Sequence, residues 1–138
     1  MIGKTYGGSR YETLNDALKT EDEGFLLIGS TNSPVSDEVT ETPRGDSDFW
    51  LVRIDSTGQK LWDRRFGGNG SEICYGGIQN TEGYLLFGET NSGTSGDKTS
   101  TARGQSDFWL VQIRPDGTLV WEKRWVVPAE MWLIMALG

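Results

Sequence analysis

Four acidic residues in one stretch of the chain carry side chains suited to binding a cation. Asp46 and Asp48 stand two residues apart, and Asp37 and Glu38 precede them. Carboxylate oxygens suit calcium, but calcium takes six or more oxygens, and the usual loop of alternating Asp and Asn ligands is absent here. Calcium is therefore the only cofactor that the sequence suggests, and we otherwise expect none.

The residues that common catalytic mechanisms need are missing or poorly placed. The chain has no histidine, which removes the commonest general base and the usual zinc ligand. The single cysteine, Cys74, falls in a predicted strand, where a buried and unreactive thiol is the default. The glycine-rich run 67–70 precedes a strand, whereas a phosphate-binding site of this kind needs a helix. We therefore expect a protein that is not an enzyme.

Charge and hydropathy exclude two kinds of partner. The net charge of -7 disfavours nucleic acid, because binding to its backbone requires clustered cations. The apolar tail from Trp125 to Gly138 is shorter than the roughly 20 residues that cross a bilayer, so we expect no membrane span. The first residues contain no hydrophobic run of the kind found in a signal peptide.

The elements that must position these residues are encoded twice. The segment FLLIGSTNS at 25–33 returns as YLLFGETNS at 84–92, and SDFWLVRI at 47–54 returns as SDFWLVQI at 106–113. Both recurrences have the same offset, 59 residues. A unit of that length, made of short strands and turns, is typical of propeller-like arrays.

Each unit is predicted to form four antiparallel strands. The expected strands are 13–20, 25–30, 48–55 and 59–66 in the first copy, and 73–79, 84–89, 107–114 and 118–125 in the second. The third strand alternates, so that Trp50 and Val52 share one face while Phe49 and Leu51 share the other. Four tryptophans at matched positions are expected to pack blades together, since aromatic side chains dominate core energetics: Trp50, Trp62, Trp109 and Trp121.

The longest loops, 32–46 and 91–105, form the expected binding edge. They are rich in Ser, Thr, Asp and Gly and differ most between the copies; Gln105, for example, stands in place of Asp46. Binding sites often lie in long polar loops on a rigid scaffold. The simpler interpretation is that these loops are solvated and have no binding function. The candidate binding residues in or beside these loops are Asp37, Glu38, Asp46, Asp48, Asp97 and Asp107.

With these residues in view, the pattern resembles the β-propeller-like repeats of secreted and surface proteins from Bacteroidetes-type bacteria. The matching segments are 67–72, 82–84 and 104–113, together with Trp121. The resemblance implies an all-β fold of antiparallel four-stranded blades and a scaffold or binding role toward a protein or glycan ligand. It also implies an extracellular or cell-surface location for the parent protein.

Two other functions stay open on the sequence. The segments 55–62 and 116–121 also resemble the tryptophan-docking motif of quinoprotein propellers, which would make the chain part of a catalytic propeller. Alternatively, copies of the chain associate through their blade edges and complete a ring as an oligomer.

The repeat boundaries divide the chain into four parts. Residues 1–8 are the expected end of a preceding blade, 9–66 the first repeat, 67–125 the second, and 126–138 an aberrant apolar tail. Back-translating the tail with suitable codons and shifting the frame by two nucleotides permits a repeat-like sequence, and the unique Trp and Met codons force three of its residues, so we interpret the tail as a frameshifted start of a third repeat. An amphipathic or oligomer-contact tail is the alternative. The sequence thus predicts a fragment of a larger repeat protein.

Overall fold

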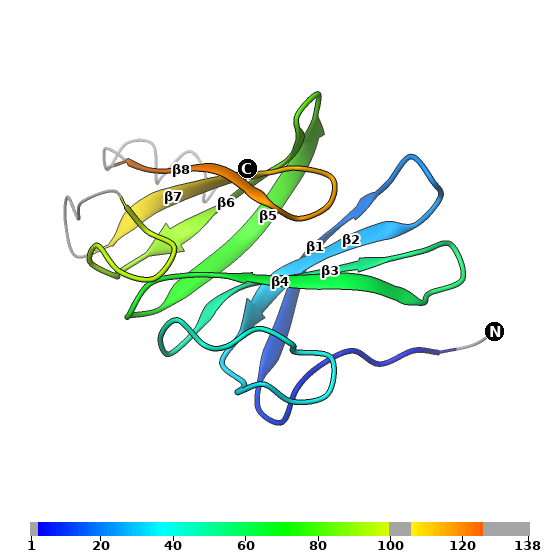
Figure 1. Cartoon of the computed structure of the whole chain (residues 1–138), viewed down its shortest axis with the longest axis horizontal. Coiled ribbons are helices and arrows are strands. Elements are labelled where there is room, and N and C mark those ends of the chain that lie inside the picture. Colours follow the sequence, from blue (N-terminus) through cyan, green and yellow to red (C-terminus); the bar gives the residue numbers. More distant parts are fainter. Residues whose placement is uncertain (1–2, 100–105, 126–138) are drawn as a thin grey trace, which may run out of the picture.

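The computed structural model describes residues 3–99 and 106–125, and all regular elements in these ranges are β-strands (Figure 1). They form two four-stranded antiparallel sheets, which confirms the predicted all-β class. The strands of the first sheet follow chain order: β1 (Glu12–Lys19), β2 (Phe25–Thr31), β3 (Asp48–Ile54) and β4 (Lys60–Phe66). The second sheet follows the same order: β5 (Glu72–Asn80), β6 (Gly83–Thr90), β7 (Asp107–Ile113) and β8 (Leu119–Trp125). The aberrant tail lies outside the described residues.

The two sheets share their irregularities as well as their strand order. The register shifts between Leu14 and Asp16 in β1, and at the matching place between Cys74 and Gly76 in β5. The last hairpin of each sheet turns through a glycine with positive φ, Gly58 at 87° and Gly117 at 89°, a conformation that L side chains rarely adopt. The duplicated sequence therefore produces duplicated backbone detail.

The two sheets pack through unlike faces. We call the side of a sheet that carries Phe49 and Leu51, or their repeat counterparts, its Phe face, and the side that carries Trp50 and Val52, or theirs, its Trp face. The Phe face of the first sheet packs against the Trp face of the second, where the rings of Phe49 and Trp109 lie 4.7 Å apart between centroids. The buried residues of this interface are Leu26, Ile28, Phe49, Leu51, Phe66, Cys74, Tyr84, Leu86, Trp109, Val111 and Ile113.

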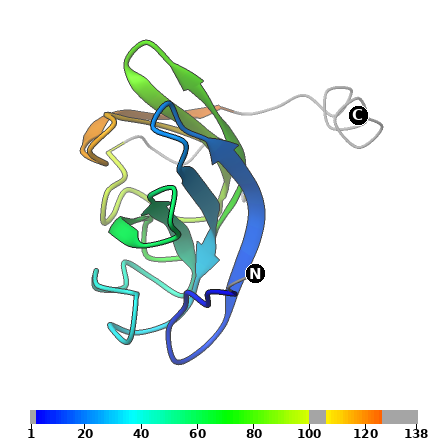
Figure 2. The same cartoon turned by 90° about the vertical axis from the view of Figure 1, so that its right-hand side faces the viewer.

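The first strands of the two sheets run together along one side of the molecule, as Figure 2 shows for β1 and β5. The side-chain amide of Asn15 donates to the Cys74 carbonyl at 2.7 Å, and the Gly77 amide donates to the Asp16 carboxylate at 3.3 Å. Burial raises the pKa of the Cys74 thiol well above its usual range, so this side chain behaves as a small core residue.

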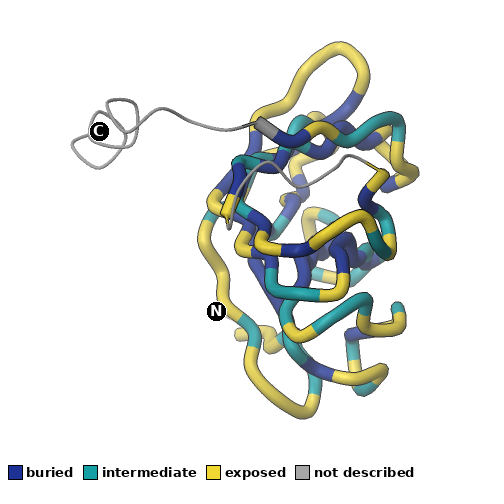
Figure 3. Tube along the Cα trace, turned by 90° about the vertical axis from the view of Figure 1, so that its left-hand side faces the viewer, coloured by how far each residue is buried: buried dark blue, intermediate teal, exposed yellow. Residues whose placement is uncertain are grey.

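A second, smaller core covers the Trp face of the first sheet. Trp50 and Val52 are buried there with Val39 from the β2–β3 loop, and Tyr6 packs against them from the N-terminal segment. In Figure 3 the buried residues lie in the interior of the molecule, whereas exposed residues gather in the hairpin turns, in the N-terminal segment and along β1, which has no buried residue. The long loops therefore start from strands that the core holds firmly.

Candidate binding edge and its polar network

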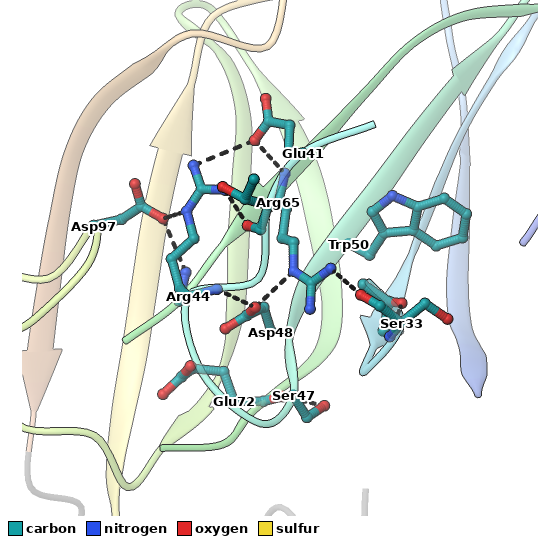
Figure 4. A network of polar contacts seen from close by, with 12 residues as sticks. Ser33, Glu41, Arg44, Ser47, Asp48, Trp50, Arg65, Glu72 and Asp97 are labelled. Atoms are coloured by element: carbon teal, nitrogen blue, oxygen red, sulfur yellow. Dashed lines mark hydrogen bonds and ion pairs between the residues drawn. The ribbon is translucent and has the colours of Figure 1, made fainter. Parts of the chain in front are cut away.

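The two loops predicted to bind lie side by side at one edge of the molecule. The Arg44 Nε atom in the β2–β3 loop is 3.0 Å from the Asp97 Oδ2 atom in the β6–β7 loop (Figure 4). Asp97 Oδ2 also accepts from the Gly67 amide at 3.0 Å, and the Asp46 amide donates to the Gly70 carbonyl at 2.9 Å. The loop of one repeat is thus tied to the β4–β5 connection and to the loop of the next.

A buried ion pair anchors the start of β3 beneath this edge. The Arg65 Nε atom donates to Asp48 Oδ2 at 2.6 Å, and both side chains are fully buried. Arg65 Nη1 also donates to the Ser33 carbonyl at 2.6 Å, which fixes the first residues of the loop (Figure 4). Asp48 therefore belongs to the framework below the binding edge.

The second repeat builds the same anchor. Arg124 Nη1 lies 3.5 Å from Asp107 Oδ2, and Arg124 Nη2 donates to the Ser92 carbonyl at 2.6 Å. Sequence reasoning selected Asp48 and Asp107 as binding candidates without their arginine partners. The available signal was that an Asp and an Arg recur together, 17 residues apart, in both repeats.

A glutamate, half-buried in the first repeat and fully buried in the second, organises the other side of each loop. Glu12 accepts from Thr31 Oγ1 at 2.6 Å and from the Gly8 amide at 2.9 Å, and it also accepts from the Ser33 hydroxyl. Burial opposes ionisation of Glu12, but hydrogen bonds from Ser33 and Thr31 outweigh it and lower its pKa. The second repeat repeats these contacts with Glu72, Gly68, Thr90 and Ser92.

The four candidate packing tryptophans occupy two kinds of position. Trp50 and Trp109 are buried, and their indole N–H groups donate to carboxylates of the fourth strand, Asp63 at 3.0 Å and Glu122 at 2.6 Å. Trp62 is half-buried against the core between the sheets. Trp121 is also half-buried, with Lys123 Nζ 5.4 Å from its ring centroid.

The remaining acidic candidates are spread along the edge. Asp37 is exposed with a left-handed φ of 48°, whereas Glu38 accepts from the Gly7 amide at 3.1 Å, as Asp97 does from Gly67. Asp46 is exposed. Within 3–99 and 106–125, no three His, Cys, Asp or Glu side chains converge in an arrangement that could hold a metal ion.

One polar cleft opens at the edge beside the β2–β3 loop. It has a volume of about 410 Å³ and places an exposed cation and an exposed carboxylate on the same cavity. Its lining residues are Arg10, Asn32, Pro34, Pro43, Gly45 and Asp46. Of the six acidic candidates for binding, only Asp46 lines this cleft, and no sequence pattern pairs it with Arg10.

No protein-family model matches the chain, and no curated protein is significantly similar to it. In the part of the chain that the structure describes, no helix has the length and apolar character needed to cross a membrane.

Proposed function

We propose that the chain is a non-catalytic scaffold and binding module made of two propeller-like blades. The observation that carries this proposal is the duplicated polar framework beneath the loops. In each repeat an arginine pairs with an aspartate and donates to a carbonyl of the loop, and a glutamate accepts from a threonine hydroxyl at the start of the loop. A framework of this kind holds loops in place for contact with another molecule.

The cleft at the loop edge suits a ligand rich in hydroxyl groups. Arg10 supplies donors, Asp46 supplies acceptors and Asn32 has an amide that can do both, while two prolines give a rigid wall. A glycan, or a polar protein loop, has the matching groups. A glycan fits the extracellular location proposed for the parent protein.

The proposal is tested by probing an array of neutral and acidic oligosaccharides with the purified chain. We expect retention on a subset of the array, and we expect Asp46→Ala and Arg10→Ala to abolish it. Lys19→Ala is the control, because Lys19 is exposed on β1 outside the cleft. Retention that survives both cleft substitutions would show that the ligand binds elsewhere, and no retention on any oligosaccharide would reject the glycan.

A further inference from the structure

The Trp face is covered along its whole width in the second repeat but only in part in the first, where Trp50 and Val52 are buried in the smaller core. Tyr84 and Cys74, on the Trp face of the second sheet, are 4% and 0% exposed because the first sheet covers them. Their repeat counterparts on the first sheet, Phe25 and Leu14, are 40% and 64% exposed. The part of the Trp face that lies over the first two strands is therefore buried in the second sheet and exposed in the first.

The Phe face shows the opposite pattern. Leu26, Ile28 and Leu51 are fully buried on the Phe face of the first sheet. On the second sheet, the counterpart of Leu18 is Ile78, which is 52% exposed. The counterparts of the three buried residues are only half-buried, namely Leu85, Phe87 and Leu110.

We propose that a second copy of this chain docks head to tail, with the Phe face of its second sheet on the Trp face of the first sheet. The docked interface would repeat the one already present between the sheets, with an apolar residue at the counterpart of each of Leu18, Ile28, Cys74 and Tyr84, namely Ile78, Phe87, Leu14 and Phe25. Unlike faces make this contact heterologous, so it joins copies in one direction only. The inference does not depend on what the loop edge binds.

Charge at the rim also matches. Inside the chain, Arg64 of β4 donates to the Asp116 carbonyl in the turn between β7 and β8 at 3.2 Å. The counterparts on the outer faces are Lys123, exposed on β8, and the β3–β4 turn that carries Asp55. A docked copy therefore brings a cation to the counterpart turn, in which Asp55 adds a carboxylate and Thr57 stands at the position of Asp116.

The N-terminal segment marks where the incoming sheet would lie. Tyr6 packs in the smaller core with Trp50, just as Phe66, at the end of β4, packs in the larger core with Trp109. The turns match as well. A Cβ on Gly58 would contact Lys4, and a Cβ on Gly117 would contact Arg64. Residues 4–6 thus occupy the position that the end of β4 takes at the internal interface. A cleft of about 380 Å³ remains between them and the Trp face, and Leu14 and Leu27 help to line it. The incoming copy fills this cleft, and its fourth strand competes with residues 4–6 for their position.

Two charged substitutions test the docking, each blocking one face. Leu14→Glu places a carboxylate on the Trp face and Ile78→Glu places one on the Phe face, and both positions are exposed enough to leave the fold intact. Light scattering coupled to size exclusion would measure the mass of each protein up to about 100 µM, where even weak association is detectable. Val35→Glu, at a 54% exposed residue of the β2–β3 loop, is the matched control, and circular dichroism checks that all variants fold.

We expect the wild type and Val35→Glu to associate with similar Kd values. In Leu14→Glu and in Ile78→Glu the Kd should be at least about tenfold higher, because docking would bury an unpaired charge. An equimolar mixture of Leu14→Glu and Ile78→Glu should form dimers and nothing larger, because each retains one intact face. A wild type that is monomeric throughout the range would overturn the proposal. So would association that both substitutions leave unchanged, or a mixture that contains only monomers.

Discussion

At the scale of the residue, most of the charged side chains near the candidate site stabilise the fold. Arg65 and Asp48 neutralise each other in the interior, and Glu12 accepts hydrogen bonds from two hydroxyls and a backbone amide. A buried charge is tolerated when it is paired and hydrogen-bonded, which is the case in both repeats. Arg10 and Asp46, which line the polar cleft, are the charged residues that we propose contact a ligand.

Lys98 is the exception, and it predicts a pH-dependent stability. It takes the position of Val39 in the first repeat and is 2% exposed, with its ammonium 4.1 Å from the centroid of the Trp109 ring. Burial, with the nearby Arg124 charge, lowers the pKa of Lys98 to about 8 from an ordinary 10.5. Below pH 8 the folded protein therefore carries a buried charge at a cost. We expect Lys98→Met to raise the free energy of unfolding at pH 7 by about 1–3 kcal/mol.

The gain should shrink as the pH rises from 8 toward 10.5, because the folded protein then holds a neutral amine while the unfolded chain is still protonated. Urea denaturation of both proteins at pH 7 and pH 10 measures the difference. Lys19→Met, at an exposed lysine, should change stability little at either pH. An equal gain at both pH values would contradict the buried-charge explanation.

The sequence predicted the residue pattern of the strands better than the roles of the polar residues. The alternation in β3 correctly separated Phe49 and Leu51 from Trp50 and Val52, because side chains on a strand point to opposite faces in turn. It did not reveal that Asp48 pairs with Arg65. Their contact depends on the β3–β4 register and on burial, neither of which appears in a local pattern.

At the scale of the element, the first two strands of each sheet approach more closely than side chains allow. A Cβ on Gly29 would lie 1.6 Å from the Thr13 carbonyl oxygen, and one on Gly88 would lie 1.9 Å from that of Ile73. Both contacts are with backbone, which cannot move aside as a flexible side chain can. The glycine in the second strand is therefore required by the backbone of the first.

Gly29→Ala is accordingly expected to lower the free energy of unfolding by about 3 kcal/mol or more, because β1 must separate from β2. Gly93→Ala serves as the control, since a Cβ there would meet no described atom within 4 Å, and its effect should stay within about 0.5 kcal/mol. Urea denaturation measures both. Similar effects at the two positions would show that the close approach does not matter.

The hairpins and their order were predictable at this scale, whereas the packing between sheets was not. Each strand is a run of apolar or alternating residues bounded by turns such as 55–58 and 114–117. The contact between Phe49 and Trp109 joins residues of different sheets, and no local pattern states which face meets which. The polar cleft was missed for the same reason, because Arg10 and Asp46 come together only through the fold.

At the scale of the whole molecule, the interface between the sheets supplies the larger core. Its two halves come from different repeats, so neither repeat buries its half of this interface by itself. Loss of a contact there should weaken the whole chain, while loss of the matching contact on the outer face should not.

Leu51→Ala and Leu110→Ala compare the same repeat position in these two settings. Leu51 is fully buried between the sheets and Leu110 is half-buried on the outer Phe face. We expect Leu51→Ala to lower the free energy of unfolding by about 2–5 kcal/mol, and Leu110→Ala to lower it by less than about 1.5 kcal/mol. Urea denaturation at low micromolar protein, where docked copies separate, gives both values. Equal losses would contradict the assignment of inner and outer faces.

The pairing of unlike faces has a consequence for how such a gene can change. A DNA duplication that copies one 59-codon unit adds a protein segment whose Phe and Trp faces already fit both neighbours, so no new contact must evolve. Unequal recombination between the copies can remove a unit as easily, and the remaining faces still match. Each added unit would carry its own phenylalanine and tryptophan at these positions, and so could repeat the ring contact that Phe49 makes with Trp109. Such a duplication changes the number of units and leaves both faces matched, whereas the two present units differ in length only in the turn after the first strand, where the offset changes from 60 residues to 59.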